Sequence, residues 1–110
     1  MCGICGLLAL DGAGPVDRDG LHAMNAELIH RGPDSAGAIA EGPVGLAARR
    51  LAIIDLEHGD QPIRTADGRV TVVQNGEIYN HEALHAELAA AGHRLRTRSD
   101  TEVLAYAYLE

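Results

Sequence analysis

The chain carries a cysteine directly after its initiator methionine, and this position has a chemistry of its own. Removal of Met1 would leave Cys2 with a nucleophilic thiol and a free α-amino group on one residue. An N-terminal amine is an established base for activating such a nucleophile. The ordinary pKa values of the two groups are close, about 8.5 for a thiol and about 7.7–8.0 for an α-amine. Proton transfer between them is therefore nearly isoenergetic, which makes Cys2 a candidate nucleophile.

A second cysteine, Cys5, gives a C-x-x-C spacing that could instead indicate a redox pair or half of a zinc site. A redox pair of this type normally opens a helix, whereas Cys5 leads into the apolar run 6–10, which predicts a buried strand. Positions 2 and 5 of a strand face opposite sides, which opposes a disulfide. A structural zinc site needs a second ligand pair, and the chain has no other cysteine. We therefore interpret Cys5 as a small core residue and expect no metal site.

The composition indicates one small domain with a modest core. The chain has 110 residues, 46% of them apolar, and contains no Phe or Trp. Its net charge of −7 argues against a nucleic-acid or anionic-membrane surface. No apolar run reaches the length of a membrane span, and no basic region precedes the first apolar run as in a signal peptide. We expect a cytoplasmic protein with reduced thiols.

The pattern of apolar residues and turn signals predicts helices and strands interspersed along the chain. Helices are expected over 18–29 and from 81 to about 91, and a third begins after residue 99. Their end signals are Asp17, Asn80, Gly92 and the capping box Ser99–Glu102. Their apolar positions are Leu21, Met24, Leu28, Leu84, Leu88, Ala91, Leu104 and Tyr108. Extended segments are expected at 36–40, 44–54 and 70–73, with turns at 11–15, 42–43, 59–62 and 66–68.

Five stretches carry a resemblance to a known family. They are Met1–Ile4, His30–Ser35, Arg50–Asp55, Asn75–Asn80 and Ser99–Glu102. In this order and at this approximate spacing they resemble the N-terminal glutaminase domain of glutamine-hydrolysing asparagine synthetases. These are class II glutamine amidotransferases of the N-terminal-nucleophile hydrolase superfamily. The resemblance implies an α+β fold, a four-layer αββα sandwich of helices outside two stacked antiparallel sheets.

The resemblance also assigns the catalytic groups. Cys2, exposed by loss of Met1, attacks the side-chain amide of glutamine, and its own α-amino group is the base. The Asn75 side chain and the Gly76 backbone N–H form the oxyanion hole. An oxyanion needs preorganised donors, each of which contributes about 3–4 kcal/mol to lowering the barrier. Water then hydrolyses the thioester to glutamate.

Three charged residues are implied as ligands of the glutamine head group. Arg50 binds the α-carboxylate, since a guanidinium fork matches a carboxylate at two points. Glu77 and Asp100 hold the α-ammonium. Arg49 and Arg50 face opposite sides of a strand, so only one of them can enter the pocket, and alignment to the family motif selects Arg50. One Arg and two acids near one nucleophile are what a zwitterionic substrate requires.

Some of these residues also have a plainer interpretation. Asn75 and Gly76 are typical of a type I′ hairpin turn, and Asp100 of the first turn of a helix. His81 and His85 have the spacing of a metal pair, but without a third ligand they are better read as a solvated helix face. His30 and Arg31 are expected to pack the loop that walls the site, and Ala48 stands where the family often has His.

The resemblance finally implies partners. Glutamine is the substrate, and the ammonia passes to a synthetase domain that uses ATP and Mg. The glutaminase domain itself needs no cofactor, and a homodimer is left open. Residues 1–110 would be the N-terminal portion of the domain, and we expect such a portion to fold poorly and lack turnover alone. The alternatives are an inactive amidotransferase-like fragment that acts as a binding module, the front domain of an amide-forming enzyme of secondary metabolism, and a redox protein.

Overall fold

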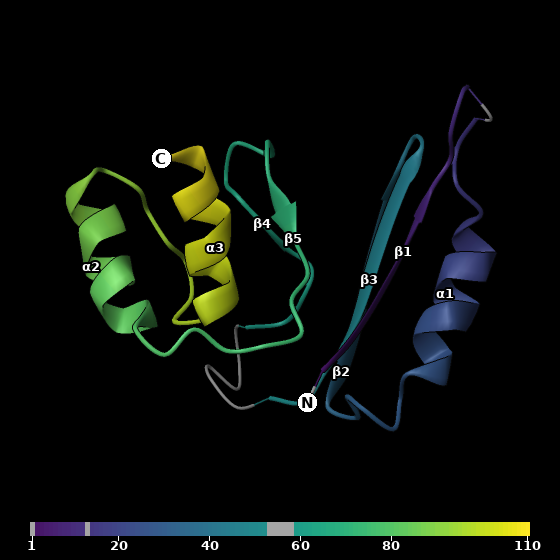
Figure 1. Cartoon of the computed structure of the whole chain (residues 1–110), viewed down its shortest axis with the longest axis horizontal. Coiled ribbons are helices and arrows are strands. Elements are labelled where there is room, and N and C mark those ends of the chain that lie inside the picture. Colours follow the sequence, from purple (N-terminus) through teal and green to yellow (C-terminus); the bar gives the residue numbers. More distant parts are fainter. Residues whose placement is uncertain (1, 13, 53–58) are drawn as a thin grey trace.

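A computed structural model describes residues 2–12, 14–52 and 59–110. The elements follow one another as two groups along the chain (Figure 1). The first group contains β1 (Gly3–Leu8), α1 (Arg18–Glu27), β2 (Ser35–Glu41) and β3 (Val44–Arg50). The second contains β4 (Ile63–Arg64), β5 (Thr71–Val72), α2 (His81–Ala90) and α3 (Asp100–Leu109). The α+β class is confirmed, whereas the four-layer sandwich stays a prediction.

The first group is a three-stranded antiparallel sheet in the order β1-β3-β2, with α1 on one face. Two glycines allow the helix to approach: a Cβ on Gly3 would lie 3.0 Å from Leu28, and one on Gly45 would lie 3.0 Å from Leu21. The buried strand predicted at 6–10 exists but differs from the prediction in two respects. It begins at Gly3 and ends at Leu8, and Leu8 is 64% exposed because its side chain faces away from α1.

The hairpin between β2 and β3 agrees with the prediction, and its turn is Gly42 followed by Pro43. Gly42 has a φ of +53°, which the first central position of a type II′ turn requires. The extended segment predicted to reach residue 54 ends as a strand at Arg50. Its positions 53–54 lie outside the described residues, as do Met1, Ala13 and the rest of 53–58.

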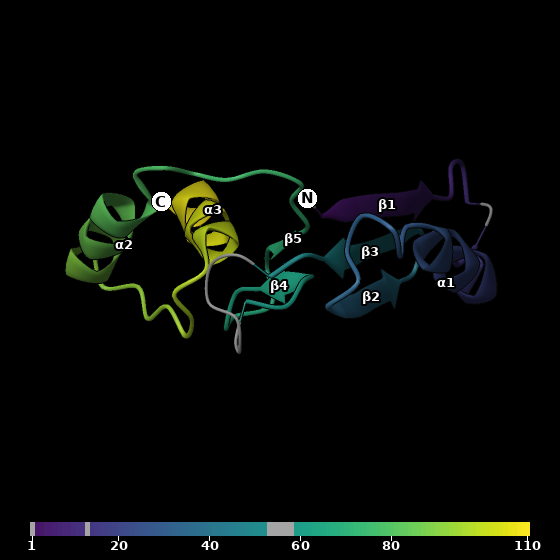
Figure 2. The ribbon, with the colours of Figure 1, turned by 90° about the horizontal axis from the view of Figure 1, so that it is seen from below.

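In the second group α3 packs against the β4–β5 ladder, and α2 packs against α3 (Figure 2). A small apolar core joins the two helices. It consists of Leu88, Val103 and Tyr106, with Leu84, Leu95 and Leu109 packed around it. The strand predicted at 70–73 shortens to the two residues of β5, and its partner β4 was not predicted. Ladders of two residues carry too little sequence pattern to be recognised.

Two of the predicted helix end signals work as expected. The Asp17 carboxylate accepts a 3.0 Å hydrogen bond from the Gly20 N–H and caps α1. Gly92, at a φ of +101°, ends α2, and the His93 N–H donates to the Leu88 carbonyl at 3.0 Å. This is the Schellman arrangement that favours glycine.

The other two end signals agree with the prediction only in part. Asn80 precedes α2 but makes no capping hydrogen bond with its side chain. Ser99 caps α3 by accepting from the Thr101 N–H at 3.2 Å, so this cap is correct. The reciprocal half of the box is wrong, because the Glu102 carboxylate instead accepts the N–H groups of Arg96 and Thr97, at 2.8 and 2.7 Å.

The predicted apolar faces of the helices are only partly buried. Leu21 and Leu88 are buried, whereas Met24 is 39% exposed and Tyr108 is 82% exposed. In α3 the buried positions are 100–103, 105 and 106, so this helix presents a mixed polar and apolar face to the β4–β5 ladder. Among the described helices, none has the length and apolar character needed to cross a membrane.

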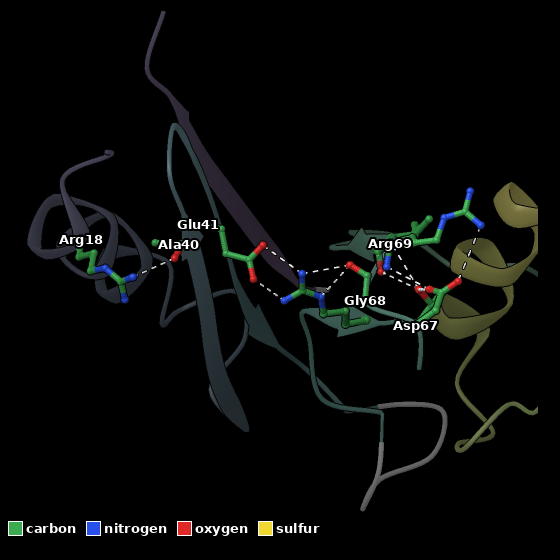
Figure 3. Close-up of polar contacts among 9 residues, drawn as sticks. Arg18, Ala40, Glu41, Asp67, Gly68 and Arg69 are labelled. Atoms are coloured by element: carbon green, nitrogen blue, oxygen red, sulfur yellow. Dashed lines mark hydrogen bonds and ion pairs between the residues drawn. The ribbon is translucent and has the colours of Figure 1, made fainter. Parts of the chain in front are cut away.

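A charged contact ties the first sheet to the second. Glu41, at the end of β2, accepts hydrogen bonds from both terminal nitrogens of the Arg64 guanidinium, and the longer of the two is 3.0 Å. The same guanidinium donates to the Gly68 carbonyl at 3.0 and 3.2 Å, so it bridges Glu41 and Gly68 (Figure 3). Backbones also meet, because a Cβ on Gly37 of β2 would collide with the Gln61 carbonyl.

Candidate active site

A cavity of about 350 Å³ lies where the two groups meet, and all six predicted site residues line it. They are Cys2, Arg50, Asn75, Gly76, Glu77 and Asp100. The lining is completed by Leu51, Gln61, Tyr79, Ser99 and Thr101. The chain thus brings the start of β1, the end of β3, the loop after β5 and the start of α3 to one place.

Cys2 stands directly before β1, at the end of the strand that points into the junction of the two groups (Figure 1). Its thiol lies 3.8 Å from the Leu51 carbonyl, and its own carbonyl accepts a 3.1 Å hydrogen bond from Arg31 Nε. Arg31 therefore packs its loop against Cys2, as predicted. Both Cys2 and Cys5 are free thiols, and burial raises the pKa of the Cys5 thiol. The condition of the α-amino group depends on Met1, which lies outside the described residues.

Arg50 is the last residue of β3, and its side chain is only 6% exposed. Its Nη1 contacts the Asp60 carboxylate at 3.0 Å, and the Ser35 hydroxyl donates to the same oxygen at 2.9 Å. Arg49 turns to the other side, where its Nε donates to the Gly32 carbonyl at 2.9 Å. The strand alternation therefore selects Arg50 for the cavity, and it arrives there already engaged with Asp60.

The loop between β5 and α2 brings Asn75, Gly76 and Glu77 to the cavity wall, where all three are exposed. The type I′ hairpin interpretation of Asn75 and Gly76 is wrong. That turn needs a positive φ at both central residues, and neither residue has one. The polypeptide instead passes from the β4–β5 ladder along the cavity lining to α2.

Asp100 is the first residue of α3 and is 6% exposed. Its Oδ2 accepts a 2.9 Å hydrogen bond from the Ile78 N–H, so it fixes the far end of the Asn75–Glu77 loop. A carboxylate at this position is also stabilised by the positive end of the helix dipole. The two interpretations of Asp100, a helix-start residue and a wall of the cavity, hold together.

Sequence reasoning missed several lining residues. Gln61 lies in a segment predicted only as a turn, and Thr101 lies in a quoted motif but was given no role. Tyr79 is 93% exposed at the rim. The signal that could have found Gln61 and Thr101 is their burial, at 8% and 2% exposed, which a single sequence does not reveal for a polar residue.

Two further sequence predictions concern residues outside this cavity. His81 and His85 are half-buried rather than fully solvated, and they border a separate hollow with Glu82 and Arg98. No group of three metal-ligating side chains occurs within the described ranges. Ala48 is 1% exposed and pairs with Gly37 across the sheet, so this position has little room for a larger side chain.

The comparison with known families identifies the class of protein. Residues 1–110 match the family described as "Glutamine amidotransferase domain". The match covers the whole chain, and the chain therefore belongs to the glutamine amidotransferase domain family.

Individual relatives are glutamine-hydrolyzing asparagine synthetases. The chain is 44% identical over 110 residues to that of Triphysaria versicolor, covering 100% of this chain and 18% of the relative. It is 43% identical over 110 residues to the enzyme numbered 1 of Arabidopsis thaliana, in a match that again covers 100% of this chain and 18% of the relative. It is 48% identical over 85 residues to the enzyme numbered 1 of Bacillus subtilis, in a match that covers 77% of this chain and 13% of the relative. The chain thus spans less than a quarter of the length of these relatives.

Proposed function

We propose that this cavity hydrolyses glutamine to glutamate and ammonia with Cys2 as the nucleophile. The observation that carries the proposal is the convergence of all six predicted residues on one cavity of about 350 Å³. The family assignment supports the same substrate. Three acidic or basic side chains around one thiol suit a small zwitterion, which a purely apolar cavity would exclude.

In the proposed reaction the Cys2 thiol gives its proton to its own α-amino group, and the sulfur bonds to the side-chain amide carbon of glutamine. The Asn75 side-chain amide and the Gly76 N–H donate to the oxyanion that forms. The tetrahedral species collapses, the carbon–nitrogen bond breaks, and the α-ammonium returns its proton to the departing ammonia. Water then cleaves the thioester, which releases glutamate and restores the thiol.

The remaining assignments are also proposals. Arg50 holds the α-carboxylate of glutamine, and Glu77 and Asp100 hold its α-ammonium. Residues 1–110 form the N-terminal portion of an N-terminal-nucleophile hydrolase domain with the four-layer αββα arrangement. The ammonia passes to an ATP- and Mg-dependent asparagine synthetase domain in the same protein. The protein works in the cytoplasm, and its assembly as a homodimer is left open. The names of the relatives support the asparagine product.

The test is glutamate release by the natural protein and by its Cys2→Ala variant. We expect Cys2→Ala to abolish glutamine hydrolysis, while amide synthesis from added ammonia continues. The matched control is Cys5→Ala, which removes the other thiol and should keep the activity. Intact mass should show loss of Met1 in the active protein. Normal hydrolysis with Met1 retained, or in Cys2→Ala, would contradict the proposal.

A further inference from the structure

Three polar residues at the cavity wall, two of which line the cavity, form a closed hydrogen-bonded circuit. The Gln61 amide nitrogen donates to the Thr101 hydroxyl oxygen at 3.2 Å. That hydroxyl donates to the Gln74 side-chain carbonyl at 2.9 Å. The Gln61 side-chain carbonyl accepts the Gln74 backbone N–H at 2.6 Å, which closes the circuit. Gln74 is thus held by both its backbone and its side chain.

The direction of these hydrogen bonds is fixed by chemistry. A backbone N–H only donates, so it must face the carbonyl end of the Gln61 amide, and the nitrogen end must face Thr101. The Thr101 hydroxyl has one proton, which is left for the Gln74 carbonyl. A hydroxyl that accepts on one side and donates on the other is the group this position requires, and neither Val nor Ala supplies one.

Neighbouring elements hold Thr101 and Gln61 in place. Thr101 is 2% exposed in the first turn of α3, where the Ser99 cap and the buried Glu102 carboxylate fix the backbone. The backbone of Gln61 packs directly against β2, because no side chain fits between Gly37 and the Gln61 carbonyl. Through this circuit, α3 and the first sheet together fix the position of Gln74.

What Gln74 positions is the adjoining pair, Asn75 and Gly76. An added Cβ on Gly76 would find the Gln74 amide nitrogen as its nearest neighbour, at 3.5 Å. At the far end of the same loop the Ile78 N–H is held by Asp100, the residue directly before Thr101. Both ends of the Asn75–Glu77 loop are thus attached to the first turn of α3.

We propose that Gln61 and Thr101 are positioning residues that hold Asn75 and Gly76 in the geometry of an oxyanion hole. The inference rests on the proposed function, since it names what aims the donors of that reaction. A donor displaced by a fraction of an ångström loses its advantage in the transition state but little of its contact with bound glutamine. The circuit should therefore control kcat for glutamine rather than KM.

The test compares Thr101→Val with Thr101→Ser in the natural protein. Val keeps the shape and removes the hydroxyl, whereas Ser keeps the hydroxyl. We expect Thr101→Val to lower kcat for glutamine hydrolysis by about tenfold to a hundredfold with KM nearly unchanged. Thr101→Ser should restore most of the rate, and Gln61→Met should reproduce the loss.

The matched control is Thr65→Val. Thr65 is also buried, at 3% exposed, and its hydroxyl bonds to Asp67 at 2.7 Å, but it does not line the cavity. Its variant should lose stability and keep kcat. Equal kcat in Thr101→Val and wild type, or equal kcat losses in both Val variants, would overturn the inference.

If Thr101→Val does not fold, Gln74→Met decides, because it removes one arm of the circuit at a half-buried position and leaves the backbone N–H. An unchanged kcat in Gln74→Met would then overturn the inference, and a loss of kcat at constant KM would support it. Failure of the proposed function is recognised separately. In that case wild type releases no glutamate from glutamine, or Cys2→Ala releases it normally.

Discussion

Arg50 and Asn75 are proposed to contact opposite ends of glutamine, and their kinetic effects should differ accordingly. The carboxylate that Arg50 binds is present in the ground and transition states alike, so Arg50→Ala should raise KM, by about tenfold or more. The oxyanion exists only in the transition state, so Asn75→Ala should lower kcat by about a hundredfold to a thousandfold. Steady-state kinetics of glutamate release in the natural protein measure both.

The control for these variants is Arg69→Ala. The Arg69 side chain is 74% exposed and lies outside the cavity lining, so its removal changes the charge without changing the site. An exchange of the two kinetic patterns would show that the head group and the amide of glutamine lie the other way round in the cavity.

The two cysteines should differ in reactivity. Burial raises the pKa of the Cys5 thiol, which lowers its thiolate fraction near neutral pH, and the thiolate is the form that is alkylated. Cys2 lines the cavity and Cys5 does not. We therefore expect iodoacetamide to label Cys2 several times faster than Cys5, as measured by peptide mass spectrometry over time. Equal rates, or a disulfide between the two residues, would support the redox interpretation instead.

At the scale of the elements, the contact between Glu41 and Arg64 should make stability depend on pH. The hydrogen bonds from Arg64 hold the pKa of the Glu41 carboxyl below its usual range. A carboxyl with a lowered pKa in the folded state contributes stability above its unfolded pKa, and loses this contribution as the pH falls through the folded pKa. The contact joins β2 to β4, so its loss loosens the attachment of the two sheets (Figure 3).

The variant that checks this is Glu41→Gln, which keeps the shape and removes the titration. Its thermal midpoint should be slightly lower than that of wild type near neutral pH, because an exposed ion pair contributes little. The difference should shrink as the pH falls below the usual pKa of a glutamate. A difference that stays constant with pH would show that the contact is not the source.

Sequence patterns predicted those elements whose signals are local. The Asp17 cap, the Gly42–Pro43 turn and the Gly92 end of α2 each depend on residues within a few positions, and the structure has all of them. Signals that depend on distant partners were missed or misread. Glu102 serves Arg96 and Thr97 rather than Ser99, and β4 exists only through its pairing with β5.

The same distinction between local and distant signals applies to the candidate site. The resemblance supplied all six of the proposed reacting and ligand-binding residues, and the cavity contains every one of them. The residues that hold these groups were not found. Gln61 reaches across 40 positions to Thr101, and Thr101 across 27 to Gln74. Hydrogen bonds between such distant positions leave no periodic pattern in a single sequence.

At the scale of the whole molecule, the three-stranded sheet is covered by α1 on one face, and the second group covers the other face only in part, through the Gly37–Gln61 and Glu41–Arg64 contacts, which leaves the rest of that face open. The open face, as we use the term, consists of Ile4, Leu8 and Val44, which are 43%, 64% and 42% exposed. Leu8 and Val44 are directly paired across β1 and β3, so their apolar surfaces are continuous. Apolar surface of this kind associates in water because its burial is favourable.

We expect the 110-residue chain, purified by itself, to self-associate through this open face and to bind an apolar fluorescent dye. Burying one leucine contributes about 1.5–3 kcal/mol, so Leu8→Lys should weaken the association constant by about tenfold or more. Leu10→Lys is the matched control, because Leu10 is 66% exposed but lies beyond the end of β1. Both variants add the same charge, and only the first places it on the paired surface. Sedimentation at several concentrations measures the association constant. A wild-type chain that stays monomeric and binds no dye would show that the apolar surface of the open face does not drive association.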